Sequence, residues 1–307
     1  MERKRVLLAW GGIAVVAAVA ALVIFRSPGP STPRELLRHL PAQNAPVLSV
    51  DFEALRRSGI LALLAAAKVD QEPEYKTFVA KTAFDYSRDL DRALLAFHSS
   101  GVYFLLHGRF DWRKLEAYAR EQGGSCVNSL CRMPGSSPDR RISFFLLRRD
   151  LMALAVSADD WAASKMSEPS AAPAPIVPPS APVWLFLPQA ALRKADSFPT
   201  GTQLFVKAME DAESLTLSLG TSGPAIEARL DVLCPTAREA ALLATTLERI
   251  TKLLRDLIAR EKTQPKPGDF AQLLMSGVFQ QQDRHVSGKW PVDRALIESL
   301  AGRPAAP

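Results

Sequence analysis

Cysteine is scarce in this chain of 307 residues, which contains only Cys126, Cys131 and Cys234. No cysteine lies directly after the apolar run near the N-terminus, and this absence excludes a lipoprotein anchor. Cys126 and Cys131 have a C-x4-C spacing without a second cysteine pair or a nearby histidine, which argues against a zinc site. Two alternatives stay open for this pair: a local disulfide formed in an oxidising compartment, or two free buried thiols.

Short catalytic strings are also absent. The sequence contains no HExxH, GxSxG, Walker A or GxGxxG pattern, and its four histidines are scattered along the chain. We therefore assign no catalytic, cofactor-binding or metal-binding residue, and we expect no cofactor. An enzyme with a dispersed site remains an alternative, because tertiary structure can bring distant side chains together.

Long basic runs are missing as well, although the formal net charge is +6. The densest basic pairs are Arg56-Arg57, Arg140-Arg141 and Arg148-Arg149, and none of them extends to five residues. Nucleic-acid binding requires a clustered basic patch, commonly with stacking aromatic side chains. The sequence therefore predicts no nucleic-acid partner.

One long apolar run is present. Residues 6–25 are 20 uncharged, mostly apolar residues, and Arg3, Lys4 and Arg5 precede them. About 20 such residues span a bilayer as a helix, and flanking basic residues stay on the cytoplasmic side. We expect a single-pass inner-membrane protein with a cytoplasmic N-terminus and an extracytoplasmic body. A cleaved signal peptide is the alternative, but its apolar region is usually only about 7 to 15 residues long.

Proline-rich segments divide the rest of the chain. The segment 27–33 predicts a stalk, and the segment 167–182, which reads SEPSAAPAPIVPPSAP, predicts an exposed linker. The expected units are a cytoplasmic tip and anchor at 1–26, the stalk at 27–33, a first half at 34–166, the linker at 167–182, a second half at 183–303 and a tail at 304–307.

The two halves have the same predicted order of elements. Each begins with an extended run that leads into a helix, at Pro46 and at Pro182, and continues with a hairpin, a helix, a second hairpin and a short helix. The closing helices are expected at 159–166 and 292–300, and the longest helix at 235–262. This order predicts an α+β fold of two related halves, each an antiparallel sheet with helices on one face.

The longest predicted helix carries an apolar stripe of Leu243, Leu247, Ile250, Leu254 and Leu257. These residues step by four, three, four and three, as in a coiled coil, but only over about two heptads. We expect the stripe to pack on its own sheet, with a dimer seam as the alternative. The oligomeric state is not predicted.

An acidic stretch at 84–92 contains Asp85, Asp89 and Asp91, interleaved with Arg88 and Arg92. Three carboxylates this close together could hold a hard cation such as calcium. The ligand order and central glycine of an EF-hand are missing, and the arginines can neutralise the carboxylates. We expect a structural turn stabilised by helix capping and ion pairs.

The first half contains three distinctive strings. The first is TAFDYSRDLD at 82–91, the second is GRFD at 108–111, and the third consists of Pro46, Asp51, Leu55, Arg56 and Ser58. Together they resemble the strings of an uncharacterised family of bacterial membrane-anchored proteins. Ala83 replaces the family's usual glycine, so a positive φ is not expected there, and Arg57 is a further departure. The resemblance implies no activity. It marks these structural-motif residues: Asp85, Arg88, Asp89, Asp91, Arg92, Gly108, Arg109 and Asp111.

These observations favour a non-enzymatic, membrane-tethered extracytoplasmic protein that binds a partner or scaffolds an envelope assembly. The alternative is a carrier that holds a lipid or other apolar envelope component in a groove between sheet and helices. A broad exposed apolar patch would favour the first hypothesis, and an enclosed apolar pocket the second.

Overall fold

The structure is a computed structural model that describes residues 32–65, 73–137, 139–170, 175–194, 196, 198, 202–222, 225–261 and 270–300. The predicted anchor at 1–26, most of the stalk and the tail at 304–307 lie outside the described residues. Within the described part of the chain, no helix has the length and hydrophobicity that a membrane crossing requires.

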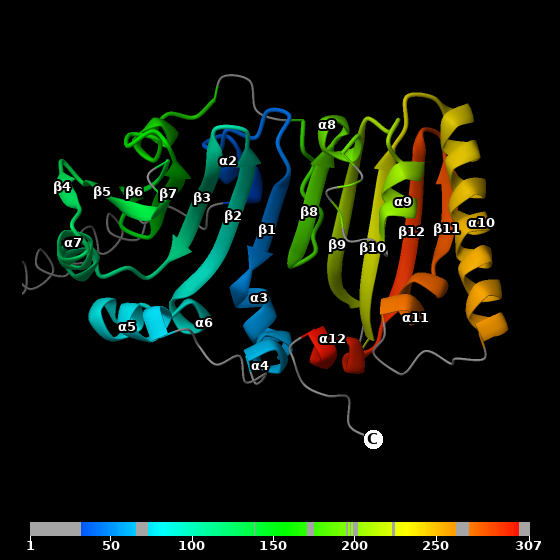
Figure 1. The fold of residues 1–307 in the computed structure, drawn as a ribbon, viewed down its shortest axis with the longest axis horizontal. Helices are drawn as coiled ribbons and strands as arrows, with labels where there is room; N and C mark the ends of the chain where they lie inside the picture. The colour runs from blue at the N-terminus through cyan, green and yellow to red at the C-terminus, as the bar shows by residue number, and fades with distance from the viewer. Residues whose placement is uncertain are drawn as a thin grey trace, which may run out of the picture.

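All strands belong to a 12-stranded antiparallel sheet with the order β11-β12-β10-β9-β8-β1-β2-β3-β7-β6-β5-β4 (Figure 1). The strands are β1 (Val47–Asp51), β2 (Leu90–His98), β3 (Gly101–Gly108), β4 (Ser125–Val127), β5 (Leu130–Ser137), β6 (Arg140–Arg148), β7 (Leu151–Ser157), β8 (Val183–Pro188), β9 (Ser214–Ser222), β10 (Ala225–Leu233), β11 (Val278–Gln282) and β12 (His285–Val292). The α+β class and the antiparallel pairing are therefore confirmed.

Short helices connect most of the strands. They are α2 (Pro33–Leu37), α3 (Phe52–Arg57), α4 (Ile60–Ala65), α5 (Pro73–Thr82), α6 (Tyr86–Asp89), α7 (Trp112–Glu121), the 3-10 helix η1 (Ser164–Ser167), α8 (Gln189–Leu192), α9 (Gln203–Ala208), α10 (Ala237–Glu261), α11 (Phe270–Met275) and α12 (Arg294–Leu300). The longest is α10, which lies along the β11 end of the sheet (Figure 1).

The first strands of the two predicted halves pair with each other at the centre of the sheet. Val47 lies opposite Phe186 and Val50 opposite Val183, in antiparallel register. Outward from this pair the order is β1-β2-β3-β7-β6-β5-β4 on one side and β8-β9-β10-β12-β11 on the other. The expectation of one sheet per half is therefore wrong, because β1 and β8 join both sets of strands into one sheet.

Helices cover both faces of this sheet, which corrects the expectation of helices on one face only. On one face, Leu36 and Leu37 of α2 pack with Val47 and Leu94 in the largest core cluster. On the other face, α10 packs on the second set of strands and α7 packs on the outer strands of the first set. Each face of the sheet therefore contributes to a buried core.

Several predicted boundaries differ from the observed ones because capping residues set the helix ends. Thr32 caps α2 and Pro33 is its first residue, so the predicted stalk ends earlier than expected. Thr236 accepts a hydrogen bond from the amide of Glu239, so α10 begins at Ala237 and not at Pro235.

The two closing helices also differ from expectation. Only the 3-10 helix η1, at Ser164–Ser167, forms in the region of the predicted 159–166 helix, and α12 begins after residue 292, which still belongs to β12. The residues around Cys126 and Cys131 form the β4–β5 hairpin. In this hairpin Asn128 and Ser129 adopt positive φ values of 49° and 63° and make the turn.

The proline-rich linker is held against the body at three described points. The Ser170 amide donates to the Arg38 carbonyl at 2.6 Å, and the Pro182 carbonyl accepts from the Asp51 amide at 2.7 Å. Ile176 is only 8% exposed and belongs to the core under α2. The linker is therefore not exposed throughout, although Val177 is.

Candidate functional site

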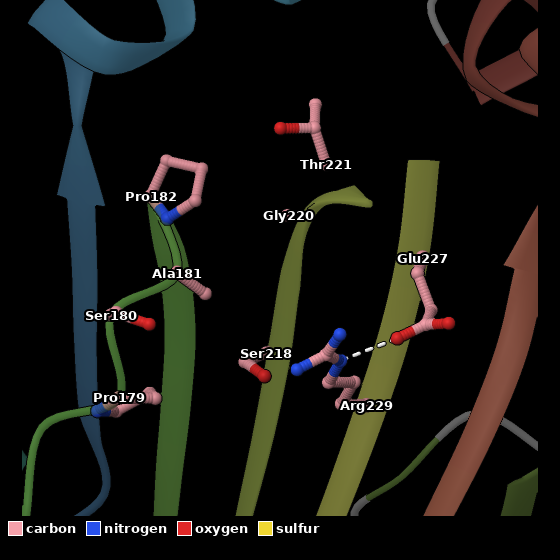
Figure 2. A pocket seen from close by; sticks show the side chains of 9 residues that line it. All are labelled: Pro179, Ser180, Ala181, Pro182, Ser218, Gly220, Thr221, Glu227 and Arg229. Carbon is pink, nitrogen blue, oxygen red and sulfur yellow. Dashed lines mark hydrogen bonds and ion pairs between the residues drawn. The ribbon is translucent and has the colours of Figure 1, made fainter. Parts of the chain in front are cut away.

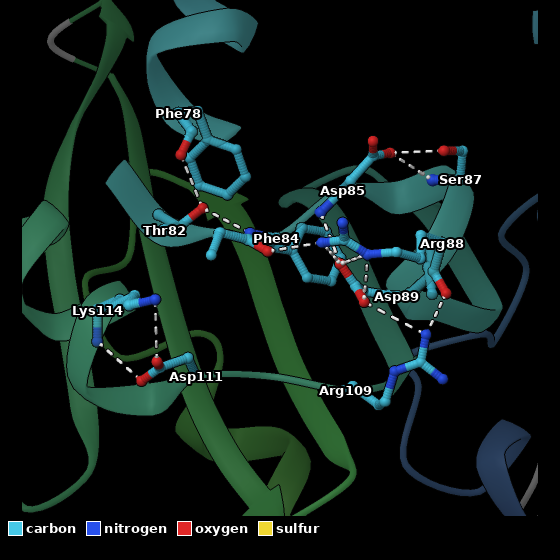
Figure 3. Close-up of polar contacts among 12 residues, drawn as sticks. Phe78, Thr82, Phe84, Asp85, Ser87, Arg88, Asp89, Arg109, Asp111 and Lys114 are labelled. Carbon is cyan, nitrogen blue, oxygen red and sulfur yellow. Dashed lines mark hydrogen bonds and ion pairs between the residues drawn. The ribbon is translucent and has the colours of Figure 1, made fainter. Parts of the chain in front are cut away.

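Asp85 begins the one-turn helix α6 within the acidic stretch. Its carboxylate accepts hydrogen bonds from the Ser87 amide at 2.9 Å and from the Ser87 hydroxyl at 2.7 Å (Figure 3). Tyr75, on α5, donates to the same carboxylate at 3.4 Å, and burial together with the Asp85 charge raises the pKa of Tyr75 to about 12. Asp85 is therefore an N-cap residue.

Asp89 lies at the centre of the polar contacts and is nearly buried. Its Oδ2 accepts from Arg88 at 2.7 Å and from the Asp85 amide at 3.0 Å, and its Oδ1 accepts from Arg109 at 3.3 Å. The Arg88 hydrogen bonds are the main reason that the pKa of Asp89 falls to about 2. Asp89 is therefore a charged structural residue whose oxygens are occupied by protein donors.

Two residues with special backbone requirements bring the TAFDYSRDLD and GRFD strings close together. Ala83 has a φ of 56°, which corrects the expectation from its alanine side chain. It follows the last residue of α5 as a left-handed C-cap, and Arg88 donates to its carbonyl at 3.0 Å. Gly108 lies against the junction of α6 and β2, where an added Cβ would clash with the Asp89 carbonyl oxygen. Only glycine permits that approach.

The remaining residues of the GRFD string lock the two strings together. Arg109 donates from its amide to the Asp89 carbonyl at 2.8 Å and from its guanidinium to the Arg88 carbonyl. The Phe110 ring stacks on the Phe84 ring with centroids 5.4 Å apart. Asp111 caps α7 by accepting from the Lys114 amide at 3.3 Å (Figure 3).

Two ion pairs attach the third string. Arg92 donates to Asp51 at 2.6 Å, and Asp51 also caps α3. Arg56 donates to Asp91 at 2.6 Å and to the Leu90 carbonyl at 2.6 Å. We call the three joined strings the motif cluster.

The motif cluster has the contacts of a structural unit. Among the described residues, no group of three or more His, Cys, Asp or Glu side chains could hold a metal ion. Asp85, Asp89 and Asp91 bind different donors instead of converging on one point. The arrangement holds α5, α6 and α7 on the end of the sheet.

Cys126 and Cys131 lie directly opposite each other in the β4–β5 hairpin and are joined as a disulfide, with Cα atoms 4.0 Å apart. The Cys131 side chain is buried against α7, with Leu115 and Ala119. Cys234 is free and buried, and desolvation raises the pKa of its thiol. A buried thiol with a raised pKa is a poor nucleophile.

The feature that sequence reasoning missed is a row of apolar side chains across the whole sheet. Residues directly opposite one another in antiparallel strands share a face. The register places the following residues in one continuous row: Cys131, Phe144, Leu154, Phe104, Leu95, Leu48, Leu185, Leu217, Leu230, Gly288 and Phe279.

Helices bury this row at both ends but leave its middle open. Cys131 and Phe144 are buried under α7, and Leu230 and Phe279 under α10. None of the six side chains between them is buried; Leu154 packs against the cluster under α7, and Leu217 is 40% exposed. We call the other five residues the open row: Phe104, Leu95, Leu48, Leu185 and Leu217. Figure 1 shows no helix of the described part of the chain in front of β1, β2 and β8.

A groove of about 610 Å³ extends the open row at one end. Phe97 and Leu187 line this groove, and each lies two residues beyond an open-row residue on the same strand and face. Phe97 is 42% exposed. Lys194 and His98 are the ionisable side chains in the lining, which contains no carboxylate.

A smaller hollow of about 200 Å³ lies where the linker joins β8 (Figure 2). Pro179 to Pro182 form one wall, and Ser218 and Arg229 form the other. Arg229 is paired with Glu227 (Figure 2). The hollow is therefore small and of mixed character, and Glu227 already neutralises the Arg229 charge in its lining.

The fold and these sites define an α+β protein with one large antiparallel sheet, a structural motif cluster and an open apolar face. No family model and no curated protein matches the sequence. Among solved structures, crystal form I of TP0453 aligns with 90% of this chain and 97% of that chain, at 10% identity and a TM-score of 0.47. Crystal form III of TP0453 aligns with 90% and 100%, at the same identity and TM-score. Similarity this low transfers no role.

Proposed function

We propose that this chain is a non-enzymatic, membrane-tethered extracytoplasmic binding protein whose partner docks on the open row. The observation that carries the proposal is the row itself, which is apolar across the sheet, buried at its ends and only partly buried at its centre. Soluble proteins rarely leave a contiguous apolar surface in water unless something binds it.

The energetics of this surface favour association. Burying a whole leucine or phenylalanine side chain contributes about 1.5 to 3 kcal/mol. Phe97 and Leu217 keep about two fifths of their area exposed, so covering each contributes about 1 kcal/mol. Several such contacts offset part of the entropy lost on association.

A photo-crosslinking experiment tests the open row. A benzoylphenylalanine residue replaces Leu217 in the full-length chain, and a matched variant replaces Leu204, which is 58% exposed on α9. We expect a discrete adduct from position 217 that is absent from position 204. The adduct should disappear when Leu95→Asp places a charge on the open row. Identical adducts from both positions, or none from 217, would contradict the proposal.

A lipid carrier is the second candidate, because the groove beside Phe97 is partly enclosed and lined mainly by apolar side chains. The same adduct distinguishes the two candidates. A lipid adduct adds the mass of one lipid to the peptide, whereas a protein adduct moves the band on a gel by many kilodaltons.

Membrane tethering is a separate part of the proposal and rests on residues 6–25. Alkaline phosphatase fused after Pro307 should be active, and carbonate should not extract the chain. A soluble form beginning near Ser27 would contradict the anchor. We also propose membership in the uncharacterised membrane-anchored family, because the motif cluster accounts for all three shared strings as structure.

A further inference from the structure

The end of the sheet at β11 carries two features that the open row does not explain. β11 is an edge strand that reads VFQQQ and contains no charge and no proline. Natural proteins protect edge strands with charges, prolines, bulges or very short strands, because a bare edge pairs with other strands. The opposite edge, β4, is only three residues long and fits that rule.

The second feature is the outer flank of α10, which we define as Glu239, Leu242, Thr246, Leu253, Leu257 and Arg260. These residues share one side of the helix by their spacing. Leu242, Leu253 and Leu257 are 68%, 52% and 46% exposed. Arg255, about 200° around the helix from Leu253, donates to the Met275 carbonyl in α11 at 2.7 Å. The outer flank therefore faces away from α11.

This flank is not the stripe considered from the sequence. Leu243 and Leu247 of that stripe are buried on the sheet, and Ile250 and Leu254 pack against the same core. Packing on its own sheet therefore accounts for those four residues. Leu257 is the exception, because it belongs to the exposed outer flank.

We propose that a second copy of this chain docks on this end, with β11 pairing antiparallel to β11 and the two outer flanks in contact. The spacing of the outer flank is 3, 4, 7, 4 and 3 residues, which is the same in both directions. In an antiparallel helix pair, Leu242 therefore lies opposite Leu257 of the second copy, and Glu239 lies opposite Arg260. A two-fold axis requires this self-complementarity.

The spacing of strands and of packed helices is compatible with one two-fold axis that relates both the β11 strands and the α10 helices. α10 packs on both β11 and β12. A two-fold axis normal to the sheet, halfway between two paired β11 strands, keeps both α10 helices on the same face. With strands about 4.8 Å apart, a helix above the line between β11 and β12 lies about 4.8 Å from the axis. The two helices are then about 9.6 Å apart, within the usual 8 to 10 Å for packed helices.

The test uses the full-length chain in detergent micelles, with its mass measured by light scattering across a concentration series. We expect a dimer whose dissociation constant rises about tenfold or more in Leu253→Glu and in Gln280→Lys. Arg260→Glu should also weaken the dimer, and adding Glu239→Arg to that variant should restore it. These side chains are exposed in one copy, so the monomer should keep its melting temperature.

Cross-linking locates the interface independently. Gln280→Cys places a thiol near the axis, and mild oxidation should give a covalent dimer, whereas the matched Lys207→Cys control on α9 should not. A monomer at all concentrations, a dimer that survives both Leu253→Glu and Gln280→Lys, or open-ended oligomers would overturn the proposal. A dimer held only by residues 6–25 would persist in both Leu253→Glu and Gln280→Lys, and this result would distinguish it from the proposed dimer.

Discussion

Replacing Asp89 by asparagine removes the central charge of the motif cluster while preserving the size of the side chain. The carboxylate accepts from Arg88, Arg109 and a backbone amide, and these contacts lower its pKa from 3.8 to about 2. Because the folded pKa lies below the unfolded one, the charge stabilises the fold above about pH 4. That stabilisation is lost as the pH falls from about 4 to 2.

The lowering of the Asp89 pKa sets the size of the change in the free energy of unfolding. A shift of nearly two pKa units corresponds to about 2.5 kcal/mol without screening. The Arg88 and Arg109 side chains are 63% and 65% exposed, so solvent screening reduces this to about 1 kcal/mol. Asp89→Asn should therefore lower the free energy of unfolding by about 1 to 2 kcal/mol at pH 7, including weaker hydrogen bonds.

The assay is urea unfolding of the full-length chain and its variants, followed by tryptophan fluorescence between pH 7 and pH 2. The difference between the parent and Asp89→Asn should shrink below pH 4. Asp211→Asn, at an exposed position between α9 and β9, serves as the matched control and should show no such trend. A difference that is the same at pH 7 and at pH 2 would refute the electrostatic argument.

Three further predictions concern the close backbone contact at Gly108, the disulfide and the linker. Gly108→Ala should cost about 1 to 3 kcal/mol of unfolding free energy, because its Cβ meets the Asp89 carbonyl; an unchanged melting temperature contradicts this. Mass mapping of the unreduced protein should find Cys126 bridged to Cys131, and alkylation of both without reduction would contradict it. Limited proteolysis should cut near the exposed Val177, and the fragments should co-elute because β1 pairs with β8; separation on elution would argue against that pairing.

Local structure could be predicted well from this sequence. The alternating runs around residues 99–101 and 221–223 predict the β2–β3 and β9–β10 hairpins, and their turns join neighbouring segments. Capping by Asp111 follows from its position before a helical pattern. Such features depend on residues close together in the chain, where periodicity and turn chemistry are informative.

Features that depend on distant segments could not be predicted. The β1–β8 pairing joins residues more than 130 positions apart, and an apolar strand does not specify its partner. The open row was missed because Leu48 and Leu95 alternate in the same way whether or not a helix covers them. Ala83 adopts a positive φ because the end of α5 and the Arg88 hydrogen bond outweigh its local cost of about 1 to 2 kcal/mol.

The central position of β1 determines the order in which the strands can pair while the chain is being synthesised. During synthesis or export, β2 can pair with β1 at once, but the other side of β1 stays bare until β8 emerges at residue 183. An exposed strand of this kind is a site for misassembly while the chain is incomplete. A nascent chain stalled before residues 183–188 have left the ribosome should therefore recruit chaperones, and the exit of those residues should end that dependence.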